Sequence, residues 1–486
     1  MEDSAHPRGR TVRSGLLTGL STGLVSLAAA GAGVVLSRKF GHGVKTDGFF
    51  AAYAVYLALV LVATALRVVV LPGFVRARSV DRLGGEVTTW LAALAIPLVP
   101  VLVLCVGWPG VVARALASDP DARHAAATLL PWLVPAAAAQ IAAGVFASAL
   151  ASLDDYAVAA AAFGGGALAG LVVIVAFVGH GVVAFGWGLA LNATLAAGVP
   201  LAVLLARGVL TRPDASPLGR LRELVEGVAL PFALQGLYLV GYRFANGLGP
   251  GKATTLSYAY LIAATLVAVT ATSIALVSTV PFARGEPTPD RVARHIGAIS
   301  WLSLATVAGA AGVFALAGAT VARHVLGSQY GGGTGAELGR LVVYFAPWMV
   351  ASIAVTVAYP LLFVRGRAKW LPLLAIGALC VHVLVEWGGR GLAGLGGVAG
   401  GLALTTAGIL AVVLGALGAL VPTLRALLPA AVVCGVVAAI AFGVPAALVG
   451  SALVAALAGL AVYALALGVG RPPGLRHAWA YLHSLQ

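Results

Sequence analysis

Long apolar segments separated by short polar ones run through almost the whole sequence. A helix needs about 20 mostly apolar residues to cross the hydrocarbon core of a bilayer. About fourteen segments reach this length, at residues 15–36, 49–73, 87–108, 125–149, 156–179, 183–206, 225–248, 254–280, 296–320, 339–363, 371–388, 393–420, 427–448 and 450–469. The pattern predicts an all-α polytopic membrane protein with about 14 transmembrane helices.

The composition excludes a soluble protein. Of the 486 residues, 61% are hydrophobic and 9% are charged, whereas a soluble domain carries roughly 25% charged residues. A soluble fold has too much surface to hide so many apolar side chains. The segments between the expected helices are short, which leaves no room for a separate soluble domain.

The basic residues between the apolar segments predict the orientation of the chain. With the N-terminus in the cytoplasm, 19 Lys and Arg residues lie on that side and 9 on the other. Cytoplasmic loops are enriched in Lys and Arg, so both termini are predicted to be cytoplasmic. The net charge of +14 is explained by this bias and by attraction to anionic lipid, and no nucleic-acid partner is expected. The Ala, Gly and Arg usage is typical of a GC-rich genome and indicates a bacterial plasma (inner) membrane.

Two stretches of the sequence resemble each other. Each has an arginine at the outer end of one helix, a glycine-rich loop, a lysine, and a second helix that ends in a proline. The matched residues are Arg38, Lys45 and Pro72 in the first stretch and Arg243, Lys252 and Pro281 in the second. An offset of six helices preserves orientation, so we expect two six-helix lobes related by an axis along the membrane normal, as in transporters with parallel repeats.

The repeat divides the chain into a series of segments. We expect a cytoplasmic N-terminal segment, an N-lobe with the first six helices, a cytoplasmic inter-lobe loop, a C-lobe with helices seven to twelve, a final helix pair and a cytoplasmic tail. Their predicted bounds are residues 1–14, 15–206, 207–224, 225–420, 421–470 and 471–486.

Basic residues also occur near the expected outer ends of the first and seventh helices, against the general charge bias. If the lobes face each other, these residues form a cluster at the outer mouth between them, and an anionic group such as a diphosphate would account for it. The cluster comprises Arg38, Lys39, Lys45, Arg243 and Lys252. The alternative is that exposed loop charges carry no function.

Few charged residues fall inside the expected spans, where each costs roughly 2.5–3.5 kcal/mol. Arg67 lies two-thirds along the second helix and either lines a cavity or extends to the cytoplasmic face. His382 and Glu386 are four residues apart near the outer end of the eleventh helix, with Arg390 four further on. They form either a proton-coupling pair or a salt-bridged helix end.

Other chemistry has little support in the sequence. P-loop, GxSxG and HExxH motifs are absent, which disfavours ATP hydrolysis and hydrolytic catalysis. The three cysteines lie in apolar segments without metal-ligand spacing, so neither a metal site nor a cofactor is expected. Asp154 and Asp155 are expected in a solvated inner turn. Asp119 and Asp121 suit a membrane glycosyltransferase, but no outer domain exists to bind sugar, so we do not expect an enzyme.

The segment from Ser37 to Phe50 resembles the first outer loop of the lipid II flippases of the MviN/MurJ type. These belong to the multidrug/oligosaccharidyl-lipid/polysaccharide exporter superfamily, and their pattern is close to A-R-x-F-G-x-G-x-x-[AT]-D-A-F-F. The matching residues are Arg38, Phe40, Gly41, Gly43, Asp47, Phe49 and Phe50. The resemblance places Asp47 with the basic residues of the rim as a candidate substrate-binding residue.

The resemblance also implies positions for the family's cavity arginines. They fall near Ser26, Ala32, Val60 and Leu261, none of which is basic. Arg67, Arg38 and Arg243 are the substitutes that the chain offers. The departure favours a diverged member of the family, with a lipid-linked glycan other than lipid II as an alternative substrate.

Together these observations predict a flippase that moves a polyprenyl-diphosphate-linked cell-envelope precursor across the membrane by alternating access. The expected partners are this lipid-linked glycan, the phospholipid bilayer and proteins of cell-envelope biosynthesis. Coupling to the membrane potential or to a monovalent cation is expected, since one charge moved across 100 mV is worth about 2.3 kcal/mol. The alternatives are a cation-coupled multidrug antiporter and a non-transporting scaffold of a cell-wall assembly.

Overall fold

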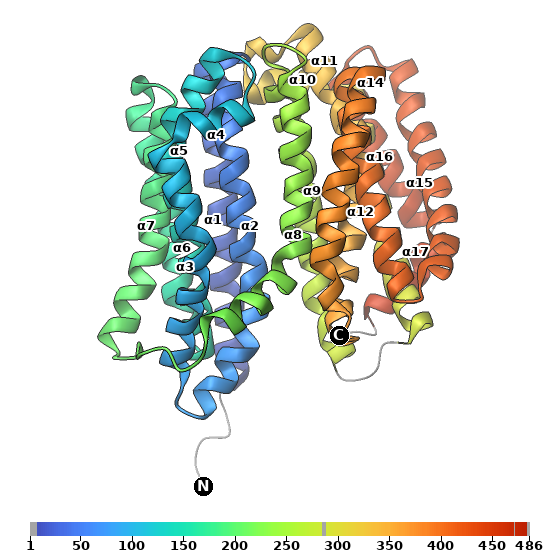
Figure 1. The fold of residues 1–486 in the computed structure, drawn as a ribbon. Helices are drawn as coiled ribbons and strands as arrows, with labels where there is room; N and C mark the ends of the chain where they lie inside the picture. Colours follow the sequence, from blue (N-terminus) through green and yellow to red (C-terminus); the bar gives the residue numbers. More distant parts are fainter. Residues whose placement is uncertain (1–6, 284–287, 471, 484–486) are drawn as a thin grey trace. The chain divides into compact units, whose positions relative to one another are not determined.

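The computed structural model describes residues 7–283, 288–470 and 472–483, and these residues form helices and connecting turns without a β-strand (Figure 1). The longer helices are α1 (Pro7–Phe40), α2 (Val44–Ser79), α3 (Leu83–Gly107), α5 (Pro120–Ser152), α6 (Tyr156–Phe177), α7 (Val183–Ala206), α8 (Pro217–Asn246), α9 (Lys252–Ala283), α10 (Pro289–Leu326), α14 (Leu371–Ala416), α15 (Leu420–Leu448) and α16 (Ala452–Gly470). The shorter ones are α4 (Pro109–Leu116), α11 (Gly332–Tyr344), α12 (Ala346–Ala358), α13 (Pro360–Val364), α17 (Pro473–His483) and the 3-10 helices η1 (Val178–His180), η2 (Ser328–Tyr330) and η3 (Ala368–Trp370).

The structure confirms an all-α polytopic membrane protein. Within the described residues, 12 helical segments are long and apolar enough to cross a bilayer. This number counts α14 once, although its backbone leaves helical geometry at Ala393 and Gly394 and so divides it into two segments. Helix α9 occupies the eighth expected span. The expected spans therefore all correspond to helices of the structure.

A close backbone approach holds the two segments of α14 together. A side chain built on Gly397 would lie 1.8 Å from the Gly389 carbonyl oxygen, and one built on Gly389 would lie 2.8 Å from that of Gly397. Only glycine fits at these two positions. The sequence predicts the two separate spans by their length, and the glycines explain how they form a tight hairpin.

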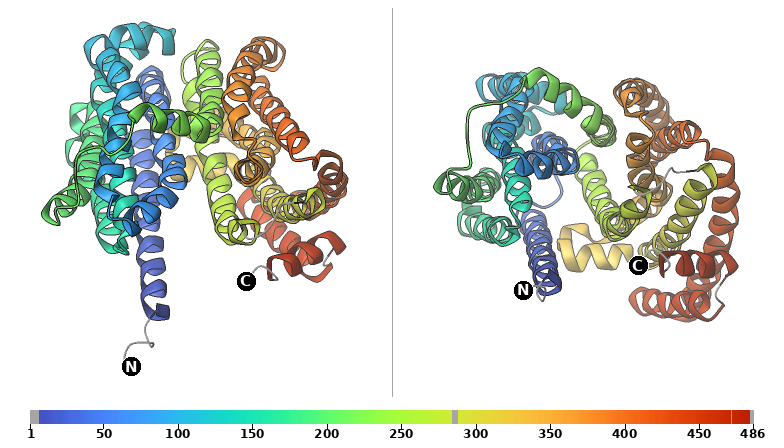
Figure 2. Two further views of the ribbon diagram at one scale, coloured as in Figure 1. Left: turned by 60° about the horizontal axis from the view of Figure 1, so that its bottom comes forward. Right: turned by 90° about the horizontal axis from the view of Figure 1, so that it is seen from below.

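Contacts divide the chain into unit 1 (Met1–Leu239) and unit 2 (Val240–Gln486), with the boundary inside α8. In unit 1, α5 packs against α2 and α7, and α6 packs against α1 and α7. A large apolar core joins α2, α3 and α5 around Trp90, Phe74 and Leu150. Figure 2 shows these helices from below in its right view.

In unit 2, α10 is the central helix and contacts α11, α12, α15, α16 and α17. Helix α12 packs between α9 and α14. The C-terminal helix α17 covers Trp301 of α10, where a side chain at Gly474 would lie 2.2 Å from the indole ring. Two apolar clusters, one around Cys434 and one around Phe442, connect α10 to α15, α16 and α17.

The turn containing Asp154 and Asp155 is solvated at Asp154, as expected, because that side chain is 78% exposed, whereas the Asp155 side chain is 20% exposed. Arg78 of α2 forms a salt bridge with Asp154 at 2.8 Å, and Arg207 after α7 forms one with Asp155. Asp155 also accepts a hydrogen bond from the backbone N–H of Val158 and so caps α6. The two salt bridges were not predicted, because Arg78 lies in α2 and Arg207 follows α7, and their proximity to the turn is not visible in the local sequence.

The segment between α7 and α8 packs on the start of α3. Side chains built on Gly84 and Gly85 would clash with the Val209 carbonyl oxygen and the Asp214 carboxylate. Glu86 accepts hydrogen bonds from the Trp90 indole at 3.0 Å and pairs with Arg220 at 2.8 Å. These contacts attach the beginning of α8 to unit 1.

Candidate functional site

The loop between α1 and α2 contains most of the motif that resembles the lipid II flippases. Gly41 has a φ of 69°, in the left-handed region that favours glycine. The Thr46 hydroxyl donates a hydrogen bond to the Gly41 carbonyl at 3.0 Å. Gly48 lies so close to α5 that a side chain there would approach the Ala122 carbonyl oxygen to 2.5 Å. Gly41 and Gly48 are therefore required by the fold of this loop.

The aromatic residues of the motif pack into unit 1. Phe40 and Phe49 both contact Phe185 of α7, with ring centroids 6.2 and 5.3 Å apart. Phe49 also stacks on Tyr53 at 5.3 Å, and Phe50 is buried. These edge-to-face and stacked contacts fix where α1 ends and where α2 begins.

The charged residues of this loop lie in two environments. Arg38 and Lys39 in the last turn of α1 and Lys45 at the start of α2 are exposed. Asp47 is buried in the first turn of α2, where its negative charge interacts favourably with the helix dipole. The exposed cations are therefore the accessible charges of this loop, and substrate binding by these four residues stays a prediction.

The matching basic residues of unit 2 lie at the end of α8 and the start of α9. Arg243 is exposed in the last turn of α8. The Lys252 ammonium forms an ion pair with Glu337 of α11, with Nζ 2.7 Å from Oε1 and 2.9 Å from Oε2. The expected cluster of unit 1 and unit 2 cations stays a prediction.

Glu337 is a candidate residue that the sequence analysis missed. Only four acidic residues follow position 250, and Glu337 is one of them. The scarcity of acidic residues in this part of the sequence was the signal that could have identified Glu337. Because 85 residues separate Glu337 from Lys252, their spacing in the sequence does not indicate that they form a pair. The pair lies on a cavity of about 810 Å³ within unit 2, which Arg340, Tyr344 and the turn of the α14 hairpin also line. This cavity has the mixed polar and apolar lining of a ligand site.

The sequence correctly places His382 and Glu386 together. On the first segment of α14, His382 Nε2 lies 3.3 Å from Glu386 Oε1, and both side chains are fully buried. The other ring nitrogen of His382 lies 2.9 Å from the Thr405 hydroxyl on the second segment. Neither carboxylate oxygen of Glu386 has a hydrogen-bond partner among the described residues. The 3.3 Å separation allows the two side chains to share one proton.

Small residues surround the Glu386 carboxylate on two sides. A side chain at Gly401 would lie 2.6 Å from its Oε1 atom, and one at Gly241 of α8 would lie 3.6 Å away. The expected salt-bridged helix end with Arg390 is not formed among the described residues, because the Arg390 guanidinium lies over the Phe244 ring at 5.7 Å. Thr405 could not be assigned from the sequence because it belongs to the following helical segment.

Arg67 lies on α2 with an exposed side chain. Its guanidinium lies 4.8 Å from the centre of the Phe163 ring of α6, a cation–π geometry. The ring partially compensates for the loss of water around the charge. Arg67 is thus held on the surface of unit 1, two-thirds along α2.

Comparisons with known proteins identify the fold. No family model matches the chain, and no curated protein matches it. A solved structure of the lipid II flippase MurJ in an inward closed conformation has a TM-score of 0.70 at 12% identity and covers 94% of this chain and 98% of its own. An inward-facing multidrug resistance MATE family transporter of the MOP superfamily has a TM-score of 0.68 at 14% identity, covering 83% and 94%. A MOP superfamily transporter from Pyrococcus furiosus has a TM-score of 0.61 at 14% identity, covering 86% and 95%.

The chain has the fold of MOP superfamily transporters. At these identities the likeness concerns the fold alone, and both flippases and multidrug transporters share it.

Proposed function

We propose that this multi-pass membrane protein is a transporter that moves a polyprenyl-diphosphate-linked cell-envelope glycan precursor from the inner to the outer leaflet of a bacterial plasma membrane. The observation that carries the proposal is the loop from Ser37 to Phe50, which combines a flippase-like motif with the exposed cations Arg38, Lys39 and Lys45. The structural likeness agrees with a transporter of either kind, because a lipid II flippase and a multidrug transporter both share the fold.

Alternating access between the two units is the proposed mechanism. Each unit has its own apolar core and internal packing, which suits movement of each unit as a rigid body. The exposed cations of each unit, Arg38, Lys39 and Lys45 in one and Arg243 in the other, offer charge-assisted hydrogen bonds to a diphosphate. Arg67 offers a further guanidinium within a spanning helix.

His382 and Glu386 are the proposed coupling residues. A buried carboxylate without hydrogen bonds is costly to keep charged, and the neighbouring imidazole gives it one proton-sharing partner. A change in the protonation of this pair would alter the packing of the α14 hairpin, which lines the 810 Å³ cavity. In this proposal, proton movement or the membrane potential supplies the driving force, and the protein is not an enzyme.

The second candidate is a cation-coupled multidrug antiporter. It is favoured by the same buried Glu386, because a carboxylate inside a spanning helix commonly marks a coupling site. It is disfavoured in unit 1, where the buried acids among the described residues are Asp47 at a helix start and Glu86 in an ion pair with Arg220. Neither lies free in the middle of a span.

The experiment that tests the proposal measures leaflet exposure of lipid-linked precursors in cells depleted of the protein. We expect one precursor to accumulate in the inner leaflet, and re-expression of the wild-type chain to restore its exposure. Arg38→Ala and Arg243→Ala are expected to restore it poorly, while Arg222→Ala, a pair-forming surface arginine of α8, restores it fully. Normal exposure of every precursor would contradict the proposal and favour drug export or a scaffold role in cell-wall assembly.

A further inference from the structure

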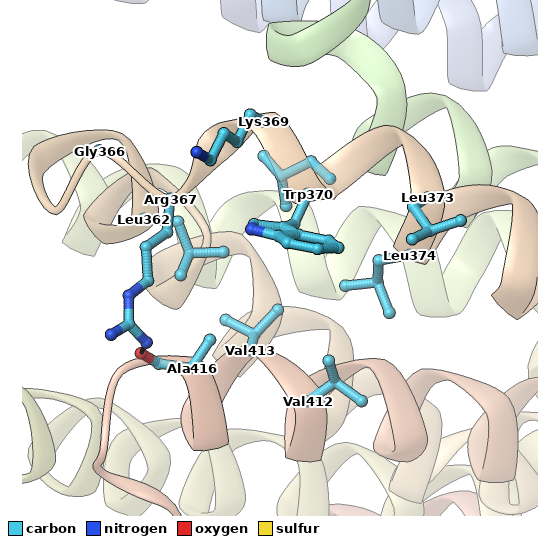
Figure 3. A pocket seen from close by; sticks show the side chains of 11 residues that line it. Leu362, Gly366, Arg367, Lys369, Trp370, Leu373, Leu374, Val412, Val413 and Ala416 are labelled. Carbon is cyan, nitrogen blue, oxygen red and sulfur yellow. Dashed lines mark hydrogen bonds between the residues drawn. The ribbon is translucent and has the colours of Figure 1, made fainter.

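A second cavity in unit 2 lies at the opposite end of the α14 hairpin from its turn. It has a volume of about 700 Å³ and is formed by the segment between α13 and α14 together with the last turns of α14. Figure 3 shows Arg367 and Lys369 on one side of this cavity, Trp370 near its centre, and Leu373 and Val412 on the other side. None of its lining residues is acidic.

The depth of this cavity follows from the length of the hairpin. The first segment of α14, Leu371 to Leu392, has 22 residues and is about 33 Å long at the helical rise per residue. The hydrocarbon core of a bilayer is about 30 Å thick. One end of the segment is the hairpin turn, so Lys369 and Trp370 at the other end lie at the level of the lipid headgroups. Tryptophan is enriched at that level.

The two cations of the cavity, Arg367 and Lys369, differ in their contacts with the rest of the protein. The Arg367 guanidinium donates a hydrogen bond to the Ala416 carbonyl at 2.6 Å, which fixes its position at the cavity wall. The Lys369 side chain is exposed, and the structure describes no hydrogen bond or ion pair for its ammonium. Their charges therefore add to a local positive potential without a neighbouring carboxylate.

The apolar side of the cavity faces outward. Trp370 is 61% exposed, Leu373 62% and Val412 54%. These side chains form a continuous apolar wall from the two cations towards the hydrocarbon region. An amphipathic lining of this kind matches an amphipathic ligand, with its charge at the Arg367 end and its chain along Leu373 and Val412.

We propose that this cavity binds one anionic phospholipid of the bilayer. The phosphate lies between Lys369 and Arg367, the glycerol region packs on Trp370, and an acyl chain follows Leu373 and Val412. Basic pockets between spanning helices bind anionic headgroups in this way, and the cavity volume is within the usual range of ligand sites. The inference does not depend on what the protein transports.

The experiment counts lipids bound to the purified full-length chain by native mass spectrometry, with phosphatidylglycerol and phosphatidylcholine as probes. Phosphatidylglycerol is expected to bind more tightly than phosphatidylcholine. Lys369→Gln, which breaks no described contact, is expected to weaken its binding about fivefold, as for one surface charge near anionic headgroups, and Lys369→Glu to weaken it further. The matched control is Arg425→Gln, an exposed cation at the start of α15 that does not line the cavity.

Several outcomes overturn the proposal. Equal binding of the two lipids would show that the protein does not recognise the charge of the headgroup. Equal losses of phosphatidylglycerol binding for the Lys369 and Arg425 variants would show that the lipid does not bind in this cavity. Displacement of phosphatidylglycerol by inorganic phosphate at millimolar concentration would show an anion site without acyl-chain contact. Trp370→Ala distinguishes the same alternatives, because it weakens lipid binding only if the glycerol and acyl regions pack in the cavity.

Discussion

Glu386 and His382 form a fully buried pair four residues apart on α14, with Oε1 and Nε2 separated by 3.3 Å. The hydroxyl of Thr405 orients the far side of the imidazole. Because the glycines at positions 401 and 241 pack closely around the carboxylate, there is little room for water to solvate it. The packing around the pair therefore depends on whether the carboxyl group is protonated.

We expect Glu386→Gln to remove any dependence of transport on a pH gradient. The amide is nearly isosteric with the carboxyl group, but it cannot exchange a proton with His382. Transport should fall by about tenfold, equivalent to about 1.4 kcal/mol of lost driving force or barrier lowering. The measurement compares transport into vesicles with and without a pH gradient. Thr405→Ser, which keeps the hydroxyl next to His382, is the control, and an unchanged response of Glu386→Gln to the gradient would exclude the pair from coupling.

Gly397→Ala is expected to destabilise the α14 hairpin. The added methyl group would lie 1.8 Å from the Gly389 carbonyl oxygen, so the two segments must separate. Overpacking of this kind costs about 1–3 kcal/mol. Thermal unfolding in detergent measures the loss. Gly400→Ala is the matched control, because nothing lies within 4 Å of the new atom there, and equal melting temperatures for the two variants would show that the close approach is not required.

Exchange of the Lys252 and Glu337 charges separates structural from substrate-binding roles. Both side chains are partly exposed, at 38% and 27%, so the ion pair contributes only about 0–1 kcal/mol to stability. Lys252→Glu should reduce transport of a diphosphate-linked substrate several-fold with little change in melting temperature. The double variant Lys252→Glu/Glu337→Lys restores the ion pair. If it does not restore transport, a cation is required at position 252 itself, which supports direct binding of substrate by Lys252. Full restoration would show that transport requires the ion pair and not a cation at position 252.

The structure of the flippase-like loop predicts different effects for substitutions of Gly41 and Gly43. Gly41→Ala should destabilise the protein by about 1–2 kcal/mol, because its φ of 69° is unfavourable for a residue with a Cβ atom. Gly43 has an extended backbone with φ of 178° and open space around it, so Gly43→Ala should be nearly neutral. Unfolding temperatures of the two variants test this difference, and similar losses at both positions would contradict the structural account of the motif.

The sequence predicts the helices well because length and apolarity alone decide which segments cross a bilayer. It also predicts the pair of His382 and Glu386, because a spacing of four residues places both on one helical face. Contacts between distant segments were not accessible in this way. Thr405 and Glu337 contribute to the two candidate sites from other helices or segments, and the partners of Asp154 and Asp155 come from α2 and from the end of α7.

The flippase-like motif between Ser37 and Phe50 also shows why function is difficult to predict from local sequence. Its glycines and aromatic residues resemble a flippase loop, yet Gly41, Gly48, Phe40 and Phe49 are explained by backbone geometry and packing on α5 and α7. Such residues specify the fold of the loop. The specificity for a substrate depends on the exposed cations around it, whose arrangement requires both units together.

The central claim is tested most directly by translocation of a fluorescent polyprenyl-diphosphate-linked sugar in vesicles that contain only the purified protein. Quenching of the outward-facing probe reports how quickly the inner pool becomes accessible. We predict that the wild-type chain accelerates this exchange, that Arg67→Ala and Arg243→Ala slow it by at least about tenfold, and that Arg222→Ala does not. Exchange no faster than in protein-free vesicles, together with proton movement driven by cationic drugs, would contradict the flippase account and establish antiport instead.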